Sequence, residues 1–160
     1  MSRLLIVVLL FISPSVFGIG KADSVLVIKS IHKLYLKKDN KVLKEYDVVF
    51  GTNPKGHKKR EGDERTPEGS YILDFKKSDS AYYKAIHISY PSEQDKQMAK
   101  QQGVDPGGQI MIHGQRNGFG WLSLIVQWFN WTDGCIAVTN KEMDEIWNAV
   151  DAGTPIVIEP

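Results

Sequence analysis

Short hydrophobic runs, bounded by polar residues and turn signals, predict β-strands along most of this chain. The first three runs are Val25–Lys29, Lys33–Lys37 and Val42–Phe50. Asp39 and Asn40 lie between the second and third runs, and these residue types favour the tight turn of a hairpin. The three runs therefore predict a meander of neighbouring strands.

A long polar loop and two further strands are predicted in the middle of the chain. Residues 51–65 combine glycine, an Asn-Pro pair and a run of mixed charge, which is typical of a solvent-exposed loop. The turn signal Thr66–Gly69 follows, and the next predicted strands are Ser70–Phe75 and Ala85–Tyr90. His57, inside the loop, has too many cationic neighbours to suggest a metal ligand.

Capping signals predict two helices of moderate length. Ser92 precedes the polar segment Glu93–Gln102, which is followed by a glycine. Thr139 and Glu142 have the spacing of a capping box for a second helix, predicted over Lys141–Asp151. One face of this second helix is hydrophobic and consists of Met143, Ile146, Trp147 and Val150.

These elements indicate a mainly β, sandwich-like domain with a few peripheral helices. A last strand is predicted over Pro155–Glu159, and the single domain spans residues 24–160. The 160-residue chain is 42% hydrophobic and 24% charged, with a formal net charge of +1, which is ordinary for a soluble globular protein. It has no basic stripe with interleaved aromatic residues, so we expect no nucleic-acid partner. We expect a monomer.

The first 18 residues have the features of a secretory signal peptide. Arg3 gives a small positive region, and Leu4–Ile12 is an unbroken hydrophobic run that is too short to span a bilayer. Val16 and Gly18 suit the small-residue rule, so we place cleavage after Gly18. An uncleaved anchor is the alternative, and the length of the run counts against it. The sequence predicts export to the periplasm or cell wall, without a stable membrane anchor.

The single cysteine, Cys135, lies directly before a predicted strand, Ile136–Val138. His113 ends another short hydrophobic run, Ile110–Ile112, and is the candidate partner of the thiol. A lone cysteine is most often a small buried hydrophobic residue. However, one cysteine forms no internal disulfide, and a free thiol outside the cytoplasm is a liability unless it reacts. Because an imidazole can take the proton of a thiol, the two residues are a candidate catalytic pair.

Glycines accompany both members of this pair. Gly114 follows His113 and permits a close backbone approach, and Gly134 precedes Cys135 and permits a tight turn. N–H groups around such a turn can face a developing oxyanion. The backbone N–H groups of Asp133, Gly134 and Cys135 are therefore the candidate oxyanion hole.

Four separated motifs follow one another along the chain. Arg65–Gly69 reads R-T-P-E-G, Ile88–Pro91 reads I-S-Y-P, and a Pro-Gly-Gly sequence leads into I-M-I-H-G at Gly114. The fourth motif, Thr132–Val138, reads T-D-G-C-I-A-V. In this order they resemble the motifs of the L,D-transpeptidase catalytic domain (YkuD/ErfK) family. The resemblance covers roughly Ser24–Pro160.

The resemblance implies a β-rich fold of the same family and an acyl transfer through a thioester on Cys135. His113 would be the general base for the thiol and the general acid for the leaving amine. The backbone carbonyl of Gly114 would orient His113. The residues implied at the oxyanion or the substrate are Thr132, Asp133 and Gly134.

Peptidoglycan stem peptides are the substrate class that the resemblance implies. The donor would be a tetrapeptide that loses its terminal D-alanine, with an amine as the acceptor. No metal or cofactor is required, and a wall-attached lipoprotein is a further candidate partner. Asp133 stands where many family members have histidine, and Ala137 where many have arginine. The acceptor therefore stays open between a stem peptide, a lipoprotein lysine, a free D-amino acid and water.

Three other functions remain open from the residues alone. With water as acceptor, the same thioester would give an L,D-carboxypeptidase or an amidase. A wall-binding module with an inactive site is the second alternative, and the intact cysteine–histidine pair argues against it. A secreted toxin that acts on the wall of a competitor is the third.

The segment between the two candidate catalytic residues is rich in aromatic side chains. Gly118–Trp131 contains three tryptophans, and Leu122–Phe129 within it is predicted as a short helix. We expect a lid packed on the core rather than a surface for docking another protein. An aromatic wall beside a nucleophile would also shape a substrate groove. His87, on the strand before Pro91, is expected to face solvent or to have a structural role.

Overall fold

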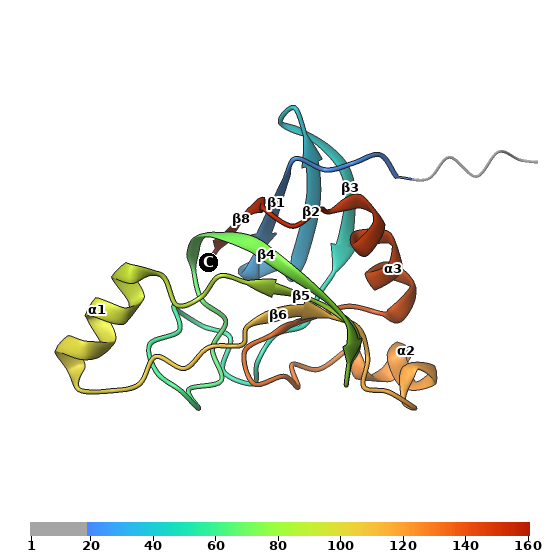
Figure 1. Ribbon diagram of the computed structural model, residues 1–160. Helices are drawn as coiled ribbons and strands as arrows, with labels where there is room; N and C mark the ends of the chain where they lie inside the picture. The colour runs from blue at the N-terminus through green and yellow to red at the C-terminus, as the bar shows by residue number, and fades with distance from the viewer. Residues whose placement is uncertain (1–18) are drawn as a thin grey trace, which may run out of the picture.

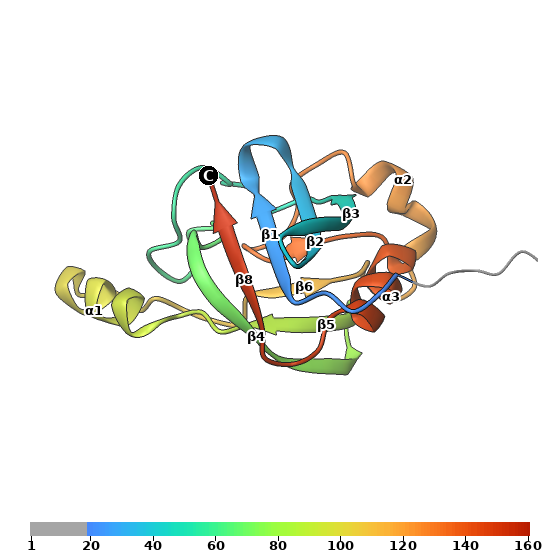
Figure 2. The ribbon, with the colours of Figure 1, turned by 90° about the horizontal axis from the view of Figure 1, so that it is seen from above.

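The computed structural model describes residues 19–160, which form an eight-stranded sheet (Figures 1 and 2). The spatial order of the strands is β3-β2-β1-β8-β4-β5-β6-β7. The strands are β1 Ser24–Ile28, β2 Lys33–Lys38, β3 Lys41–Asp47, β4 Gly69–Ser80, β5 Tyr83–Ile88, β6 Met111–His113, β7 Ile136–Ala137 and β8 Thr154–Glu159. The mainly β prediction is confirmed, whereas the predicted signal peptide, residues 1–18, lies outside the described residues.

The first three strands form the predicted antiparallel meander. Asp39 and Asn40 make the turn between β2 and β3 with φ angles of 50° and 61°, a region that Asn and Asp tolerate better than most residues. The first strand ends at Ile28, one position before the predicted end, because Lys29 begins the 3₁₀ turn η1, Lys29–Ile31. This turn takes the Lys29 side chain to the interior, where it is 5% exposed.

The sheet curls until its two ends meet. β3 ends at Asp47, earlier than the predicted Phe50, because Val49 leaves β2 and forms a bridge with Ala137 of β7. The Val49 N–H donates to the Ala137 carbonyl at 3.1 Å, and the Ala137 N–H donates back at 2.9 Å. The two facing halves of this curled sheet take the place of the two layers of the predicted sandwich.

β4 is longer than the predicted strand Ser70–Phe75. Its second half continues to Ser80 because it pairs with β5, with Lys76 opposite Ile86 in the register. Its first half pairs antiparallel with β8, and β8 pairs in parallel with β1. β8 therefore joins the N-terminal meander to the half of the sheet that carries β6 and β7.

One hydrophobic core fills the inside of the curled sheet, and both halves contribute to it. The largest fully buried side chains are Phe50, Leu34, Leu36, Leu73, Ile86, Ile88, Ile110, Ile112, Ile136, Met143, Ile146 and Ile156. Because β6 and β7 are anchored by this core, the ends of these short strands are held rigidly.

The two predicted helices are present, on opposite sides of the molecule (Figures 1 and 2). α1, Glu93–Gln102, has the predicted Ser92 cap, and α3, Asn140–Ala149, has the predicted capping box of Thr139 and Glu142. α3 ends before the predicted Asp151 because Val150 is already extended, with φ −104° and ψ 134°. No helix within residues 19–160 is long and apolar enough to cross a membrane.

The prediction of a packed aromatic lid is wrong for most of Gly118–Trp131. The segment forms a 3₁₀ turn, η2 Gly120–Leu122, and a single-turn helix, α2 Ser123–Val126. Trp121 is 77% exposed and Trp128 is 83% exposed. A helix this short offers no continuous apolar face to bury, and Phe119, Ile125 and Phe129 are also exposed. Trp131, in contrast, is only partly exposed.

The loop at residues 51–65 is not simply a solvated loop, which corrects the prediction. Lys58 is 3% exposed, and its Nζ lies 3.0 Å from Asp63 Oδ1. The same carboxylate accepts hydrogen bonds from the backbone N–H groups of Lys59, Arg60 and Arg65. The run of mixed charge therefore folds around an internal ion pair.

Candidate active site

Cys135 and His113 are brought to one cavity by two short parallel strands that lie side by side. His113 is the last residue of β6, and Cys135 directly precedes β7. Ile112 lies opposite Ile136 and His113 opposite Ala137 in the parallel register, so Cys135 lies beside Met111, two residues before His113. Both side chains line a cavity of about 270 Å³. The arrangement places a thiol and an imidazole at one solvent-accessible site.

The imidazole of His113 is held in one tautomer. Its side chain is 4% exposed, and its Nδ1 lies 2.6 Å from the Gly114 carbonyl oxygen. A carbonyl only accepts hydrogen bonds, so Nδ1 carries the proton and Nε2 is left with a free lone pair. Burial lowers the pKa of His113, while the hydrogen bond to Gly114 partly opposes this shift. His113 is therefore neutral at pH 7 and can act as a base.

The thiol of Cys135 lies against the backbone that enters β6. Its Sγ is 3.6 Å from the Gln109 carbonyl oxygen. Burial raises the pKa of Cys135, a backbone hydrogen bond from Met111 opposes this, and the charge of Asp133 raises the pKa further. Because the thiol pKa is raised and the imidazole pKa is lowered, the resting pair is a neutral thiol and a neutral imidazole.

Thr132 ties together the turn that presents Cys135. The Thr132 hydroxyl donates to the Cys135 carbonyl at 2.7 Å and accepts from the Gly134 N–H at 3.3 Å. The Gly134 N–H is thus engaged within the turn, so the Asp133 and Cys135 N–H groups are left as the oxyanion candidates. Gly134 has φ +115°, and a Cβ there would lie 2.5 Å from the Arg65 carbonyl oxygen, so only glycine fits.

The chain after His113 is fixed by Asn140, the first residue of α3. The Asn140 side-chain oxygen accepts from the Gln115 N–H at 2.8 Å. A Cβ on Gly114 would lie 2.7 Å from the same oxygen. Glycine at position 114 therefore lets the backbone approach α3 closely, and this holds the carbonyl that orients His113.

Comparisons with known proteins identify the family. Residues 22–158 match the YkuD family, the L,D-transpeptidase catalytic domain. The chain belongs to this family. It is also 34% identical over 121 residues to "Putative L,D-transpeptidase YafK" of Escherichia coli strain K12, a match that covers 73% of this chain and 42% of YafK.

Solved structures agree with this assignment. The helical cell shape determining protein Pgp2 of Campylobacter jejuni superimposes with a TM-score of 0.61 and 27% identity, over 89% of this chain and 50% of the Pgp2 chain. The L,D-transpeptidase of Xylanimonas cellulosilytica superimposes with a TM-score of 0.56 and 16% identity, over 87% and 61% of the two chains, which supports the fold alone. This L,D-transpeptidase-family chain spans about two fifths of YafK and half of Pgp2.

Two aromatic residues lie beside His113 in the site, and one of them, Tyr82, is an addition to the sequence prediction. The Tyr82 ring lies 4.7 Å from the His113 ring, centre to centre, and the Trp131 ring lies 5.7 Å from it. Both line the cavity. Tyr82 was missed because it lies in the turn between β4 and β5, where neither periodicity nor a motif marks it. Trp131 is the one member of the aromatic segment placed as the predicted wall.

Asp133 is exposed and lines the cavity of this L,D-transpeptidase-family domain. It is the one carboxylate among the ten residues that line the cavity. Its negative charge therefore favours positively charged groups of a substrate near Cys135 and disfavours negatively charged ones.

The other two histidines considered from sequence lie away from the cavity lining. His87 has Nδ1 2.7 Å from Asp74 Oδ1 and stacks on Phe75, so its role is structural, as expected. His57 has Nε2 3.0 Å from Asp95 Oδ1. Within residues 19–160, no group of three His, Cys, Asp or Glu side chains is arranged to hold a metal ion.

Proposed function

We propose that this protein is an exported L,D-transpeptidase, a cysteine acyltransferase that acts on peptidoglycan stem peptides. The observation that carries the proposal is that Cys135 lines one cavity with a buried His113 whose tautomer is fixed by Gly114. The family to which the chain belongs supports the substrate class. The names of Pgp2 and YafK fit a role in the cell wall.

Acylation begins with a proton transfer within the neutral pair. His113 Nε2 takes the thiol proton as Cys135 Sγ attacks the carbonyl carbon of the donor peptide. The carbonyl oxygen becomes an oxyanion, which the N–H groups of Cys135 and Asp133 stabilise. The C–N bond then breaks, and the His113 imidazolium gives its proton to the leaving amine of the terminal D-alanine. A thioester on Cys135 remains.

Deacylation reverses these roles. An acceptor amine attacks the thioester carbon, and His113 takes a proton from the attacking nitrogen. The C–S bond breaks, the new amide is released, and Sγ recovers its proton from the imidazolium. Water in place of the amine gives hydrolysis by the same steps. Asp133 lines the same cavity as Cys135, so its charge would disfavour an anionic acceptor.

The test is incubation of the purified mature protein with tetrapeptide muropeptides, followed by mass spectrometry of the products. We expect loss of terminal D-alanine and, with an amine acceptor present, a product heavier by the acceptor. Tripeptide as the sole product would instead assign the water-dependent reaction. An unchanged tetrapeptide would contradict the proposal.

Variants of Cys135 and His113 distinguish turnover by this protein from turnover by a contaminating enzyme in this assay. Cys135→Ala should give no turnover, because Cys135 is the single cysteine of the chain. His113→Ala should lower the rate at neutral pH by about 10²–10⁴-fold, the usual effect of removing a positioned acid–base group. Turnover by Cys135→Ala at the wild-type rate would show that the activity belongs to another protein.

Export is the second part of the proposal. It rests on the hydrophobic run in the first 18 residues and the small residues that follow it. N-terminal sequencing of the protein from an expressing bacterium should give a chain that begins at Ile19. Retention of Met1 on exported protein would contradict the predicted cleavage.

A further inference from the structure

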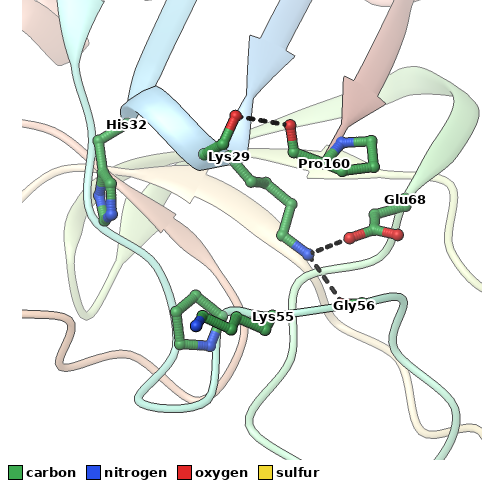
Figure 3. A pocket seen from close by; sticks show the side chains of 8 residues that line it. Lys29, His32, Lys55, Gly56, Glu68 and Pro160 are labelled. Carbon is green, nitrogen blue, oxygen red and sulfur yellow. Dashed lines mark hydrogen bonds and ion pairs between the residues drawn. The ribbon is translucent and has the colours of Figure 1, made fainter.

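Lys29 is a buried lysine with all its hydrogen-bonding capacity in use. Its Nζ donates to the Gly56 carbonyl at 2.8 Å and to Glu68 Oε1 at 2.8 Å (Figure 3). It also donates to the Thr66 carbonyl at 3.1 Å. An ammonium group has three N–H donors, so these three acceptors saturate it. Lys29 lines a cavity of about 400 Å³ on a different part of the molecule from Cys135. Because its donors are occupied, Lys29 acts on the chain around it rather than on a ligand.

A buried charge is costly unless it is paired, and this cost makes the position of Lys29 well defined. Burial lowers the pKa of Lys29, and the hydrogen bond and charge of Glu68 oppose that shift. The Glu68 side chain is 19% exposed, compared with 4% for Lys29. Lys29 therefore holds both ends of the segment from Gly56 to Glu68, one through the Gly56 carbonyl and the other through the ion pair with Glu68.

This segment is in direct contact with the turn that presents the nucleophile. Thr66 is fully buried, and its hydroxyl donates to the Gly134 carbonyl at 2.9 Å. The contact is tight, because a Cβ on Gly134 would lie 2.5 Å from the Arg65 carbonyl oxygen. A shift of residues 65–66 would therefore displace the turn before Cys135.

The Gly134 carbonyl belongs to the same peptide unit as the Cys135 N–H. A trans peptide is planar, and its C=O and N–H bonds point in opposite directions. When Thr66 holds the Gly134 oxygen, it therefore also fixes the direction of the Cys135 N–H. That N–H is one of the two oxyanion donors in the proposed reaction.

We propose that Lys29, through Thr66, is a positioning residue for the oxyanion hole. By holding the Thr66 carbonyl, it keeps the Thr66 hydroxyl on Gly134 and aims the Cys135 N–H at the developing oxyanion. This inference rests on the proposed function, because it assigns part of the same acyl transfer. Neither Lys29 nor Thr66 lines the catalytic cavity, so both act without touching the substrate.

Two reactions of Cys135 test this role, because only one of them forms an oxyanion. Acylation by a carbapenem proceeds by attack on a carbonyl, whereas alkylation by iodoacetamide displaces iodide at a saturated carbon. Both are followed by intact-protein mass spectrometry on wild type, Lys29→Met and Thr66→Val. We expect both variants to slow acylation by about tenfold or more, since removing one oxyanion donor outright costs about 10²–10³-fold. Alkylation at the same pH should stay within about twofold of wild type.

Three further variants remove the ambiguity of a destabilised protein. The double variant Lys29→Met/Thr66→Val should be no slower in acylation than the slower single variant, because both residues act through one hydrogen-bonded route. Lys29→Met/Glu68→Gln should regain part of the thermal stability lost in Lys29→Met, because it leaves no unpaired carboxylate at position 68. Its acylation should stay slow. Lys33→Met removes a paired surface lysine of β2 and should match wild type in both reactions.

The outcomes separate this inference from the proposed function. Equal slowing of acylation and alkylation in Lys29→Met, or recovery of acylation with stability in the Glu68→Gln double variant, would overturn the positioning role. Acylation at the wild-type rate in Lys29→Met or Thr66→Val would also overturn it. The wild-type protein could be acylated by the carbapenem and yet leave muropeptides unchanged. This result would contradict the proposed substrate, while the acylation rates of the variants would still test the role of Lys29.

Discussion

At the scale of single residues, the proposed role of His113 as general base predicts an acid limit for the reaction. Burial lowers the His113 pKa from its usual 6.5. A general base must be neutral, so activity is lost only as the pH falls through this lowered value. We expect the acid limb of kcat/KM for the donor peptide to have its midpoint below about pH 6.5. A midpoint above that value, from a pH profile at low substrate concentration, would contradict the buried, neutral imidazole.

Burial is the main cause of the raised Cys135 pKa, and the charge of the neighbouring Asp133 adds to it. Asp133→Asn should therefore lower that pKa. At a fixed pH below the thiol pKa, more thiolate forms, and iodoacetamide should react faster than with wild type. Turnover should remain substantial because His113 is unchanged. A loss of turnover as deep as that of Cys135→Ala would show that Asp133 has a catalytic role.

The candidate site was predictable from sequence where the chemistry is carried by a motif. Cys135 and His113 are marked by strand ends and glycines, and the structure brings them to one cavity. Tyr82 and Lys29 were not predictable, because their roles arise from segments that are distant in sequence. A lysine at the end of a short strand gives no sign that it will be buried between Thr66 and Glu68.

At the scale of elements, the cap of α3 is a local stabilising feature close to the site. The Thr139 hydroxyl accepts from the Glu142 N–H, and the Glu142 side chain returns to the Thr139 N–H. Thr139→Ala should lower the free energy of unfolding by about 1 kcal/mol, the typical contribution of an N-cap. This corresponds to a fall in Tm of roughly 2–4 °C by calorimetry. Thr139→Ser keeps the hydroxyl, so its Tm should stay near that of wild type. A fall in Tm as large as that of Thr139→Ala would argue against the cap.

The starts of the helices were predictable because their capping signals are local, whereas strand lengths were not. Ser92 and Thr139 cap their helices through residues three positions away, so the sequence alone specifies both. The ends of β4 and β3 depend on partners that are distant in sequence. β4 continues to Ser80 because it pairs with β5, and β3 stops because Val49 pairs with Ala137 instead. The prediction of a packed aromatic lid was wrong for a similar reason. A hydrophobic run in the sequence does not show whether the folded protein offers a surface for it to pack against.

At the scale of the whole molecule, the closure of the sheet also builds the site. Gly51 and Thr132 form an isolated bridge at this closure. A Cβ on Gly51 would lie 2.0 Å from the Glu64 carbonyl oxygen and 2.8 Å from the Gly134 nitrogen, both backbone atoms. Gly51→Ala should therefore lower the free energy of unfolding by about 1–3 kcal/mol, as overpacking does. It should also slow carbapenem acylation.

Gly20→Ala is the matched control, because a Cβ there has no neighbour within 4 Å. It should leave both Tm and acylation unchanged. If Gly51→Ala lost stability but kept the wild-type acylation rate, the closure of the sheet and the geometry of the site would be independent.

The placement of the tryptophans gives the protein a built-in optical reporter. Trp121 and Trp128 are exposed on the aromatic segment, whereas Trp131 is partly buried 5.7 Å from the His113 ring. A water-soluble quencher should extinguish the two exposed indoles first. In a Trp121→Phe/Trp128→Phe variant, the remaining emission comes from Trp131 and Trp147. A protonated imidazole quenches the fluorescence of a neighbouring indole. Acidification should therefore lower the emission of Trp131 as His113 gains its proton. The fluorescence would then report the protonation state of the proposed base in the resting protein, without any substrate.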